Sequence, residues 1–257
     1  MKCRAAIALA LLLVAGGCAT VPTEPVALAE YKANNDPLEP MNRKTFAFNM
    51  FLDRIIFEPI AKGYRAALPR KGRDAIRNFL GNLGEPLVFG NTILQARWKS
   101  AAITADRFVI NTVVGIAGLG DPAKRHGLPH QVGDCGQTLH AWGIGEGPYL
   151  VVPITGPSNP RDFAGSFGDL YGDPIRYVAT ANGYSDAYSI GRVFVKGIDT
   201  RAENIDSLDA LRRQSIDFYA ALRSLARQKR AAELQTGMPN QAPEPPNFYD
   251  DPGAQNP

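Results

Sequence analysis

The sequence predicts a mainly α-helical protein that is interrupted by one long loop rich in glycine and proline. Apolar residues recur every three or four positions in several segments, most clearly in residues 41–57, 101–118 and 185–205. Between the second and third of these segments, residues 136–162 contain five glycines and four prolines, which favour turns. With 257 residues and 45% hydrophobic content, the chain is long enough to form a domain with a buried core.

The N-terminal residues predict export and lipidation. Lys2 and Arg4 precede an unbroken apolar run, residues 5–15, which is too short to span a bilayer. Small residues then lead to Cys18, in a pattern that resembles the lipobox of bacterial lipoproteins. We therefore expect residues 1–17 to be a signal peptide and Cys18 to carry the lipid anchor, with Ala19 favouring the outer membrane. The alternative is a plain secretory signal with an incidental cysteine.

Composition sets the limits of the mature chain. Residues 18–35 contain prolines and small polar residues and are expected to form a tether, which leaves residues 36–236 as the folded domain. Residues 237–257 contain six prolines and few apolar residues, so we expect a disordered tail.

The signal holds two of the 28 basic residues and none of the 25 acidic ones, so the mature net charge is +1. This balance gives no reason to expect nucleic acid as a partner.

Helices are expected on both sides of the loop. A first helix spans residues 41–57, and Pro59 begins a further short segment. An amphipathic helix over residues 73–83 is expected to end near Pro86, because proline disfavours continuation of a helix. The segment 101–118 is apolar on nearly every face, which is typical of a helix that is buried or faces lipid. Beyond the loop, one helix is expected to start at Ser185 or Asp186 and another at Asp206 or Ser207.

The central loop, residues 136–162, is expected to have a defined shape. Its glycines allow sharp turns and its prolines fix φ, while residues 149–152 form a short apolar run between them. Arg161 and Asp162 follow as adjacent opposite charges. An ordinary β-hairpin with glycine-rich ends is the alternative interpretation.

The residue types do not predict catalysis or a cofactor. A group of possible zinc ligands falls within fifteen residues, but its spacing matches no standard zinc motif, so we expect no metal; it comprises His126, His130, Cys135 and His140. Ser158 lies between prolines rather than in a G-x-S-x-G motif, and no Walker A motif occurs. We therefore expect that the protein is not an enzyme.

Five blocks of sequence, in order, resemble the MlaA (VacJ) family of outer-membrane lipoproteins. The resemblance covers about residues 34–230, and the blocks are NDPLEPMNRKTFAFN (35–49), PIAKGYR (59–65), RNFLGNLGEP (77–86), RFVINTVVGIAGLGD (107–121) and the GQTL–WG–GPYLV–P–GPS–RD pattern (136–162). The resemblance implies a ring-shaped helical domain embedded in the outer membrane, with a central amphipathic channel. It also implies a location in the outer membrane, facing the periplasm.

The resemblance further implies a function and partners. Members of this family bind trimeric porins, remove mislocalised phospholipids from the outer leaflet, and pass them to a soluble periplasmic carrier. This retrograde transport maintains the lipid asymmetry of the outer membrane. The alternatives are a structural lipoprotein that braces porins and, less favoured, a phospholipid hydrolase.

Two groups of residues are candidates for this function. Arg161, Asp162, Asp169 and Arg192 are candidates for lining the channel, with ordinary surface ion pairs as the alternative. Asn42, Arg43 and Phe46, near the start of the first helix, are candidates for gating.

Replacing the predicted anchor tests the assignment of the N-terminus. Cys18→Ser should abolish acylation and membrane retention through the anchor, because the anchor consists of several buried acyl chains that the serine variant lacks. Mass spectrometry of the mature N-terminus checks this. An unmodified Cys18 in the wild type, or cleavage at another residue, would contradict the prediction.

Overall fold

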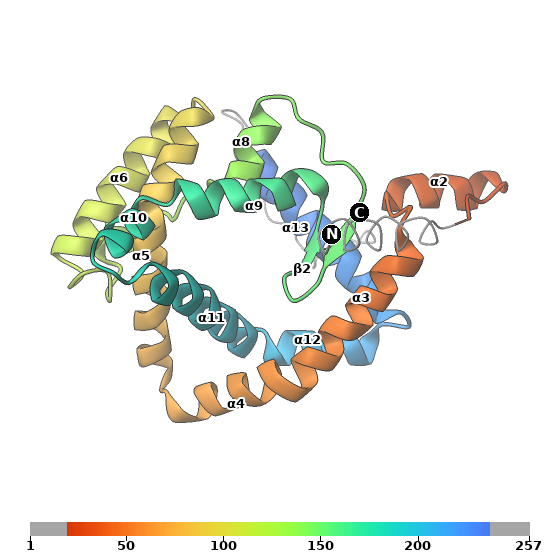
Figure 1. The fold of residues 1–257 in the computed structure, drawn as a ribbon, viewed down its shortest axis with the longest axis horizontal. Coiled ribbons are helices and arrows are strands. Elements are labelled where there is room, and N and C mark those ends of the chain that lie inside the picture. Colours follow the sequence, from red (N-terminus) through yellow and green to blue (C-terminus); the bar gives the residue numbers. More distant parts are fainter. Residues whose placement is uncertain (1–19, 237–257) are drawn as a thin grey trace, which may run out of the picture.

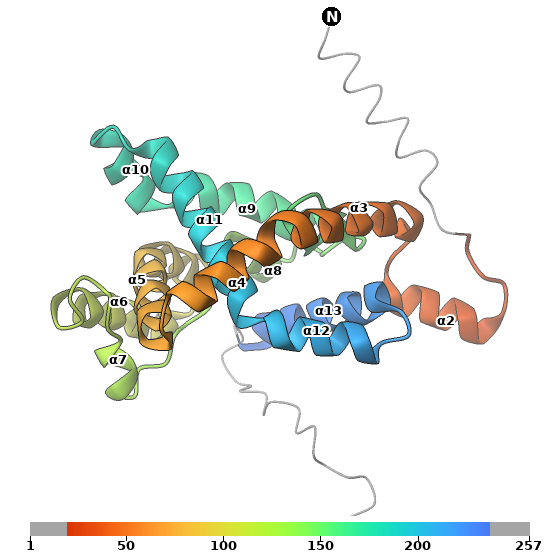
Figure 2. The ribbon, with the colours of Figure 1, turned by 90° about the horizontal axis from the view of Figure 1, so that it is seen from below.

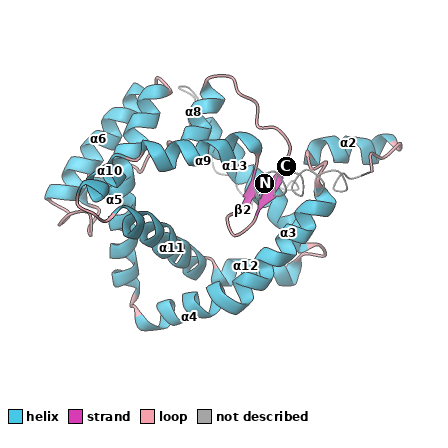
Figure 3. Ribbon diagram, viewed as in Figure 1, coloured by secondary structure: helices cyan, strands magenta, loops and turns pink. Residues whose placement is uncertain are grey.

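In the computed structural model, residues 20–236 are described, and the predicted signal peptide, Cys18 and the proline-rich tail lie outside this part. The mainly α-helical prediction is confirmed, and the helices are arranged as a ring (Figures 1 and 3). The helices are α2 Pro25–Asn34, α3 Glu39–Leu52, α4 Glu58–Ala67, α5 Arg70–Leu94, α6 Trp98–Val113, α7 Pro122–Arg125, α8 Cys135–Ala141, α9 Pro160–Gly172, α10 Pro174–Ala181, α11 Ser185–Glu203, α12 Ile205–Gln214 and α13 Phe218–Thr236.

One face of the ring carries a second layer. α3 and α4 form one side of the ring, α5 another and α9 a third, with α6 outside α5 and α11 inside the corner between α4 and α5 (Figure 1). Seen from below, α12, α13 and α2 lie in a separate layer beneath α3 and α9 (Figure 2). The ring therefore has two different faces.

A π-helical turn joins the first two long helices. Residues Asp53–Phe57 form this turn, in which the Glu58 amide bonds back to the Asp53 carbonyl. Pro59 lies in the first turn of α4, where its missing N–H costs little. The extra residue of the π turn allows α3 and α4 to continue as one rod across the proline.

The expected end of a helix near Pro86 is wrong, because α5 continues through Pro86 to Leu94. Polar contacts to α6 hold α5 in place just before the proline. Asn82 donates to the Thr112 hydroxyl at 2.9 Å, and Glu85 accepts from Arg107 Nε at 3.0 Å. Tertiary packing therefore outweighs the local preference of proline to end a helix.

The central loop is not a single loop. Residues 135–141 form α8, whose N-cap Asp134 accepts a hydrogen bond from the Gln137 amide. The alternative interpretation of a hairpin is correct for the second half, where β1 (Leu150–Val152) pairs antiparallel with β2 (Gly156–Ser158). In this hairpin Val151 lies opposite Pro157.

Burial is inverted relative to a water-soluble protein. Among the described residues, the fully buried side chains of largest volume are polar: Glu85, Asn42, Thr92, Thr104 and Thr138. Apolar side chains on α6 face outward instead, with Val109 59% and Val113 76% exposed. Within the described part, no helix is long and apolar enough to cross a membrane.

Candidate functional site

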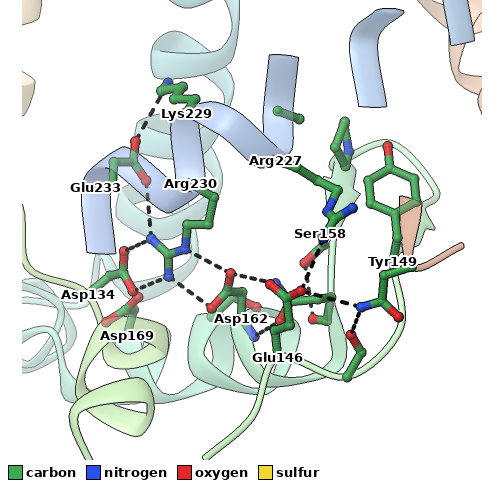
Figure 4. A pocket seen from close by; sticks show the side chains of 16 residues that line it. Asp134, Glu146, Tyr149, Ser158, Asp162, Asp169, Arg227, Lys229, Arg230 and Glu233 are labelled. Atoms are coloured by element: carbon green, nitrogen blue, oxygen red, sulfur yellow. Dashed lines mark hydrogen bonds and ion pairs between the residues drawn. The ribbon is translucent and has the colours of Figure 1, made fainter. Parts of the chain in front are cut away.

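An open cavity of about 430 Å³ lies where the hairpin, α9 and α13 meet (Figure 4). The segment before the hairpin contributes Tyr149, α9 contributes Asp162 and Asp169, and α13 contributes Arg227 and Arg230. Acidic and basic groups thus face one space from elements far apart in the sequence.

Arg230 holds two helix N-termini together at this cavity. Its guanidinium makes bidentate contacts of 2.7 and 2.9 Å to the Asp134 carboxylate and of 2.8 and 2.9 Å to Asp162. Asp134 caps α8, and Asp162 lies in the first turn of α9. Carboxylates are favoured at helix N-termini, and bidentate arginine pairs are the stronger class of ion pair. Arg230 therefore fixes α13 to the ends of two ring helices.

The two cavity carboxylates on α9 have opposite protonation behaviour. Burial by itself would raise the pKa of Asp162, but hydrogen bonds from Arg230 and Arg161 hold it below its usual value. Asp169 has no arginine contact of this kind, and burial raises its pKa to about 6, with the Asp134 charge adding to the effect. The Asp169 carboxylate accepts from the Cys135 amide at 2.9 Å and from Asn91 at 3.2 Å. Of these two carboxylates, Asp169 is thus the one that changes charge closer to neutral pH.

Asn42 connects the first helix to the hairpin. Its side chain is fully buried, and its amide nitrogen donates to Asp36 at 2.7 Å and to the Tyr149 carbonyl at 3.0 Å. Its amide oxygen accepts from the Val151 amide at 2.9 Å. Asn49, two turns later on α3, makes the same kind of contact. Its amide nitrogen donates to the Val152 carbonyl at 2.9 Å, and its amide oxygen accepts from the Ile154 amide at 2.8 Å. Two asparagines therefore bind the backbone of the hairpin as a neighbouring strand would.

Arg43 and Phe46 connect the same helix to α13. Arg43 makes an ion pair with Asp217 and lies over the Tyr219 ring, 4.4 Å from its centroid. Phe46 packs against Phe218 and Tyr219, with ring centroids 5.6 and 5.4 Å away. The three predicted gating residues thus lie at one junction, where α3 meets both the hairpin and α13.

Asp36 lies at the centre of this junction. Only 2% of the residue is exposed, and besides Asn42 its carboxylate accepts from the Tyr219 hydroxyl and, at 2.7 Å, from Arg223. Burial raises the pKa of the Tyr219 phenol, and the hydrogen bond to Asp36 adds to this shift. Tyr219 therefore stays protonated and keeps donating to Asp36.

The family is decided by comparison with known proteins, since the model of the MlaA lipoprotein family matches residues 34–233. The chain belongs to the MlaA family. The intermembrane phospholipid transport system lipoprotein MlaA of Escherichia coli is 34% identical over 231 residues, which are 87% of this chain and 85% of that protein. A Rickettsia bellii protein is 35% identical over 213 residues, or 82% of each chain.

A solved structure that is similar in sequence and fold supports the ring fold. It is described as "Structural basis for maintenance of bacterial outer membrane lipid asymmetry", and it superposes with a TM-score of 0.69 at 34% identity. The match covers 79% of this chain and 99% of the solved one. The family resemblance inferred from the five sequence blocks is confirmed.

The four candidate channel residues of this MlaA family member fall in two places. Asp162 and Asp169 line the cavity, and Arg161 is buried beside Asp162, with Nη1 3.3 Å from His140 Nδ1. Arg192 lies instead at the junction of α10 and α11, in an ion pair with Asp173. The lining of a channel by these residues stays a prediction.

The possible zinc ligands of the sequence are spread over different contacts. His130 lies 3.1 Å from Glu85, and His140 contacts Arg161, as described above. Cys135 has a free thiol beside α9, and burial raises its pKa. Among the described residues, no group of three or more metal-ligating side chains is found.

Sequence reasoning missed Arg230, Asp134, Asp36 and Asn49. The spacing of Asn42 and Asn49 by seven residues, which places both on one helix face, could have indicated a shared partner. No local pattern could have indicated Arg230, because its partners Asp134 and Asp162 lie 96 and 68 residues away in the chain.

Replacing Asp169 tests its unusual protonation. Because burial disfavours the carboxylate, the folded protein loses stability as pH rises from about 4, where the unfolded residue ionises, to about 6, where the folded one does. Asp169→Asn keeps an oxygen that can accept from Cys135 and Asn91. The variant should match wild type at pH 4 and exceed it by up to about 3 kcal/mol at pH 7, at roughly 1.4 kcal/mol per pKa unit.

Unfolding of the detergent-solubilised protein between pH 4 and 7 measures this difference. Asp106→Asn, which changes an exposed carboxylate on α6, serves as the control and should show no such trend. A difference between Asp169→Asn and wild type that does not vary with pH would show that Asp169 ionises normally.

Proposed function

We propose that this chain is a lipid-anchored outer-membrane protein that removes mislocalised phospholipids from the outer leaflet. It passes them to a soluble periplasmic carrier, in association with trimeric porins, and so maintains lipid asymmetry. The E. coli relative is named an intermembrane phospholipid transport system lipoprotein, and the similar solved structure concerns outer-membrane lipid asymmetry. Both descriptions support this proposal.

The observation that carries the proposal is the inverted burial of the ring. In water, apolar burial drives folding and exposed apolar patches are small. Here large apolar side chains are exposed on α3, α4, α6, α9, α10 and α11, whereas polar side chains fill the contacts between helices. In lipid, association depends on packing and polar contacts, and backbone groups must be satisfied internally. The surface therefore fits a ring that lies in a membrane without spanning it as a helical bundle.

The polar interior supplies what a phospholipid head group needs. Moving a charged head group through hydrocarbon is costly, because the charge loses its hydration. Charged and polar side chains around the cavity, among them Asp162 and Asp169, lower that cost by replacing water. We assign Arg161 to the same lining through its contact with Asp162. We assign Arg192, which pairs with Asp173 outside this cavity, to another part of the transport path. This function requires no nucleophile, so we propose that the protein is not an enzyme.

Surface labelling of phospholipids tests the function. Cells that lack the chromosomal copy should accumulate phosphatidylethanolamine in the outer leaflet, because nothing removes it, and the wild-type gene should restore the low level. The purified protein should release no fatty acid from phospholipid vesicles. An unchanged outer leaflet would favour a structural porin-bound protein, and released fatty acid would favour a hydrolase; either result would overturn the proposal.

We further propose that the junction of α3 with the hairpin is the gate of this transport path. Asn42 and Arg43 hold α3 to the hairpin and to α13, and Phe46 packs in the same junction. Removing Asn42 would leave the buried Asp36 carboxylate and the Val151 amide short of a partner. Each unsatisfied buried group costs about 1–3 kcal/mol. The resting position of α3 would then no longer be favoured.

Deleting Asn42 and Arg43 together tests the gate. Because each residue advances a helix by about 100°, the deletion rotates Phe46 and Asn49 by about 200° relative to residues 36–41. If α3 is no longer held in its resting position, phospholipid should flow outward through the ring. Outer-leaflet phospholipid should then rise several-fold, even in cells that also carry the intact copy. Lys44→Ala, on the exposed side of the same turn, is the control. If the deletion protein is present at normal amounts and labelling stays at the wild-type level, the gate assignment is wrong.

A further inference from the structure

α11 has two opposite faces with different surroundings. Ile198, Ala202 and Asp199 are buried on one face, where Ala202 packs against Ala61 of α4. At about 100° per residue, Val193 and Lys196 lie on the opposite side of the helix. α11 lies on the inner side of α4 in both views of the ring (Figures 1 and 2). The second face is therefore turned toward the inside of the ring.

This inner face forms an open groove of about 440 Å³ with the start of α12. Apolar atoms make up most of its wall, although Lys196 and Arg201 border it, and Arg201 is paired with Asp53. The other lining residues are Val193, Gly197 and Thr200 of α11, Asn204 and, on α12, Leu208. A groove of this kind can take a narrow apolar chain that ends in an anionic group.

Lys196 is a cation without a protein partner at this groove. In the described part of the chain, it makes no hydrogen bond or ion pair, and its side chain is accessible to solvent. Desolvation by the surrounding protein nevertheless lowers its pKa, and the like charges of Arg192 and Lys229 act in the same direction. Asp169 on α9 is the one carboxylate that acts in the opposite direction.

The position of Lys196 is unfavourable for the protein alone. Arg192 and Lys229, the like charges that act on Lys196, are themselves paired with Asp173 and Glu233. Among the described residues Lys196 has no such pair. A bound phosphate would supply this missing negative charge and would accept charge-assisted hydrogen bonds from the ammonium group. Perturbed, unpaired groups of this kind are concentrated at functional sites.

We propose that the inner face of α11 is a phospholipid subsite, in which the ammonium group of Lys196 binds the lipid phosphate and the groove holds one acyl chain. This inference rests on the proposed transport function. The subsite would be a position inside the ring at which a transported lipid binds. Head-group phosphate and acyl chain are recognised by neighbouring but different parts of one helix face.

Binding of a fluorescent phosphatidylglycerol to the full-length protein in detergent micelles tests the phosphate contact. Lys196→Gln should weaken binding roughly tenfold, the effect expected for loss of one hydrogen bond to a charged group. Lys196→Arg should retain most of the affinity, because the charge is kept. Lys99→Gln, an exposed lysine on α6 outside α5, should leave the affinity unchanged.

A leucine in the groove tests the acyl-chain contact. A Cβ at Gly197 would meet no atom within 4 Å, so Gly197→Leu is expected to fold and to fill the groove. It should weaken phosphatidylglycerol binding about tenfold. Gly191 of the same helix has equal space, and its angular position lies about 120° away, so Gly191→Leu is the matched control.

Glycerol 3-phosphate, which has the head-group phosphate but no chains, separates the two sources of phosphate. Glycerol 3-phosphate should not displace the fluorescent lipid at concentrations at which the lipid itself would saturate the protein. Displacement of the lipid by glycerol 3-phosphate would indicate a site for free phosphate and would overturn the subsite. Wild-type affinity in both Lys196→Gln and Gly197→Leu would also overturn it, while leaving the proposed function intact. Failure of the wild type to bind the lipid at all would count against the proposed function itself.

Discussion

Buried polar and charged contacts, more than an apolar core, hold this ring together. Arg107 is 4% exposed and joins Glu85 of α5 to Asp121, while Arg230 joins α13 to α8 and α9. The apolar clusters found among the described residues are small, one of them made by Ala61, Ala202 and Ile205. In water such an arrangement would give little net stability, because desolvation offsets much of the attraction between buried charges. In a lipid environment apolar burial no longer drives helices together, so polar contacts between helices are the interactions that can still hold them. Apolar side chains are then free to face outward.

The joints of the ring differ in the kind of polar contact that holds them. Arg230 is held by two bidentate pairs, which fix its geometry and are broken only together. The junction at Asn42 is different, because a single amide side chain satisfies Asp36 and the hairpin backbone at once. Rotation of α3 would break all of these hydrogen bonds in one step. This all-or-none loss of contacts is what the proposed gate requires.

The charged groups on α9 and α11 differ in how fully protein contacts satisfy them. Asp162 is neutralised by Arg230 and Arg161, whereas Asp169 and Lys196 lack such direct ion pairs among the described residues, and each is shifted toward its neutral form. Fixed ion pairs would hold the helices without attracting the cargo strongly. Weakly satisfied groups can exchange protein contacts for contacts to a phosphate or an amine. These groups belong to α9, α11 and α13, the helices that carry the proposed transport path and subsite.

Local sequence indicated the helices around residues 41–57, 73–83 and 101–118 and those after Ser185, the turn-rich segment before α9 and the family, because periodicity, proline, glycine and motif spacing act within a few residues of the chain. It also placed Asn42, Arg43 and Phe46 on the first helix, although not what they contact. Only the tertiary structure decided that α5 passes through Pro86, that Asn49 shares the role of Asn42, and that Arg230 meets Asp134 and Asp162. It also decided that α6 turns its polar residues inward. These features depend on contacts between residues far apart in the chain and on which side of each helix is buried against the rest of the protein. Neither leaves a local signal in the sequence.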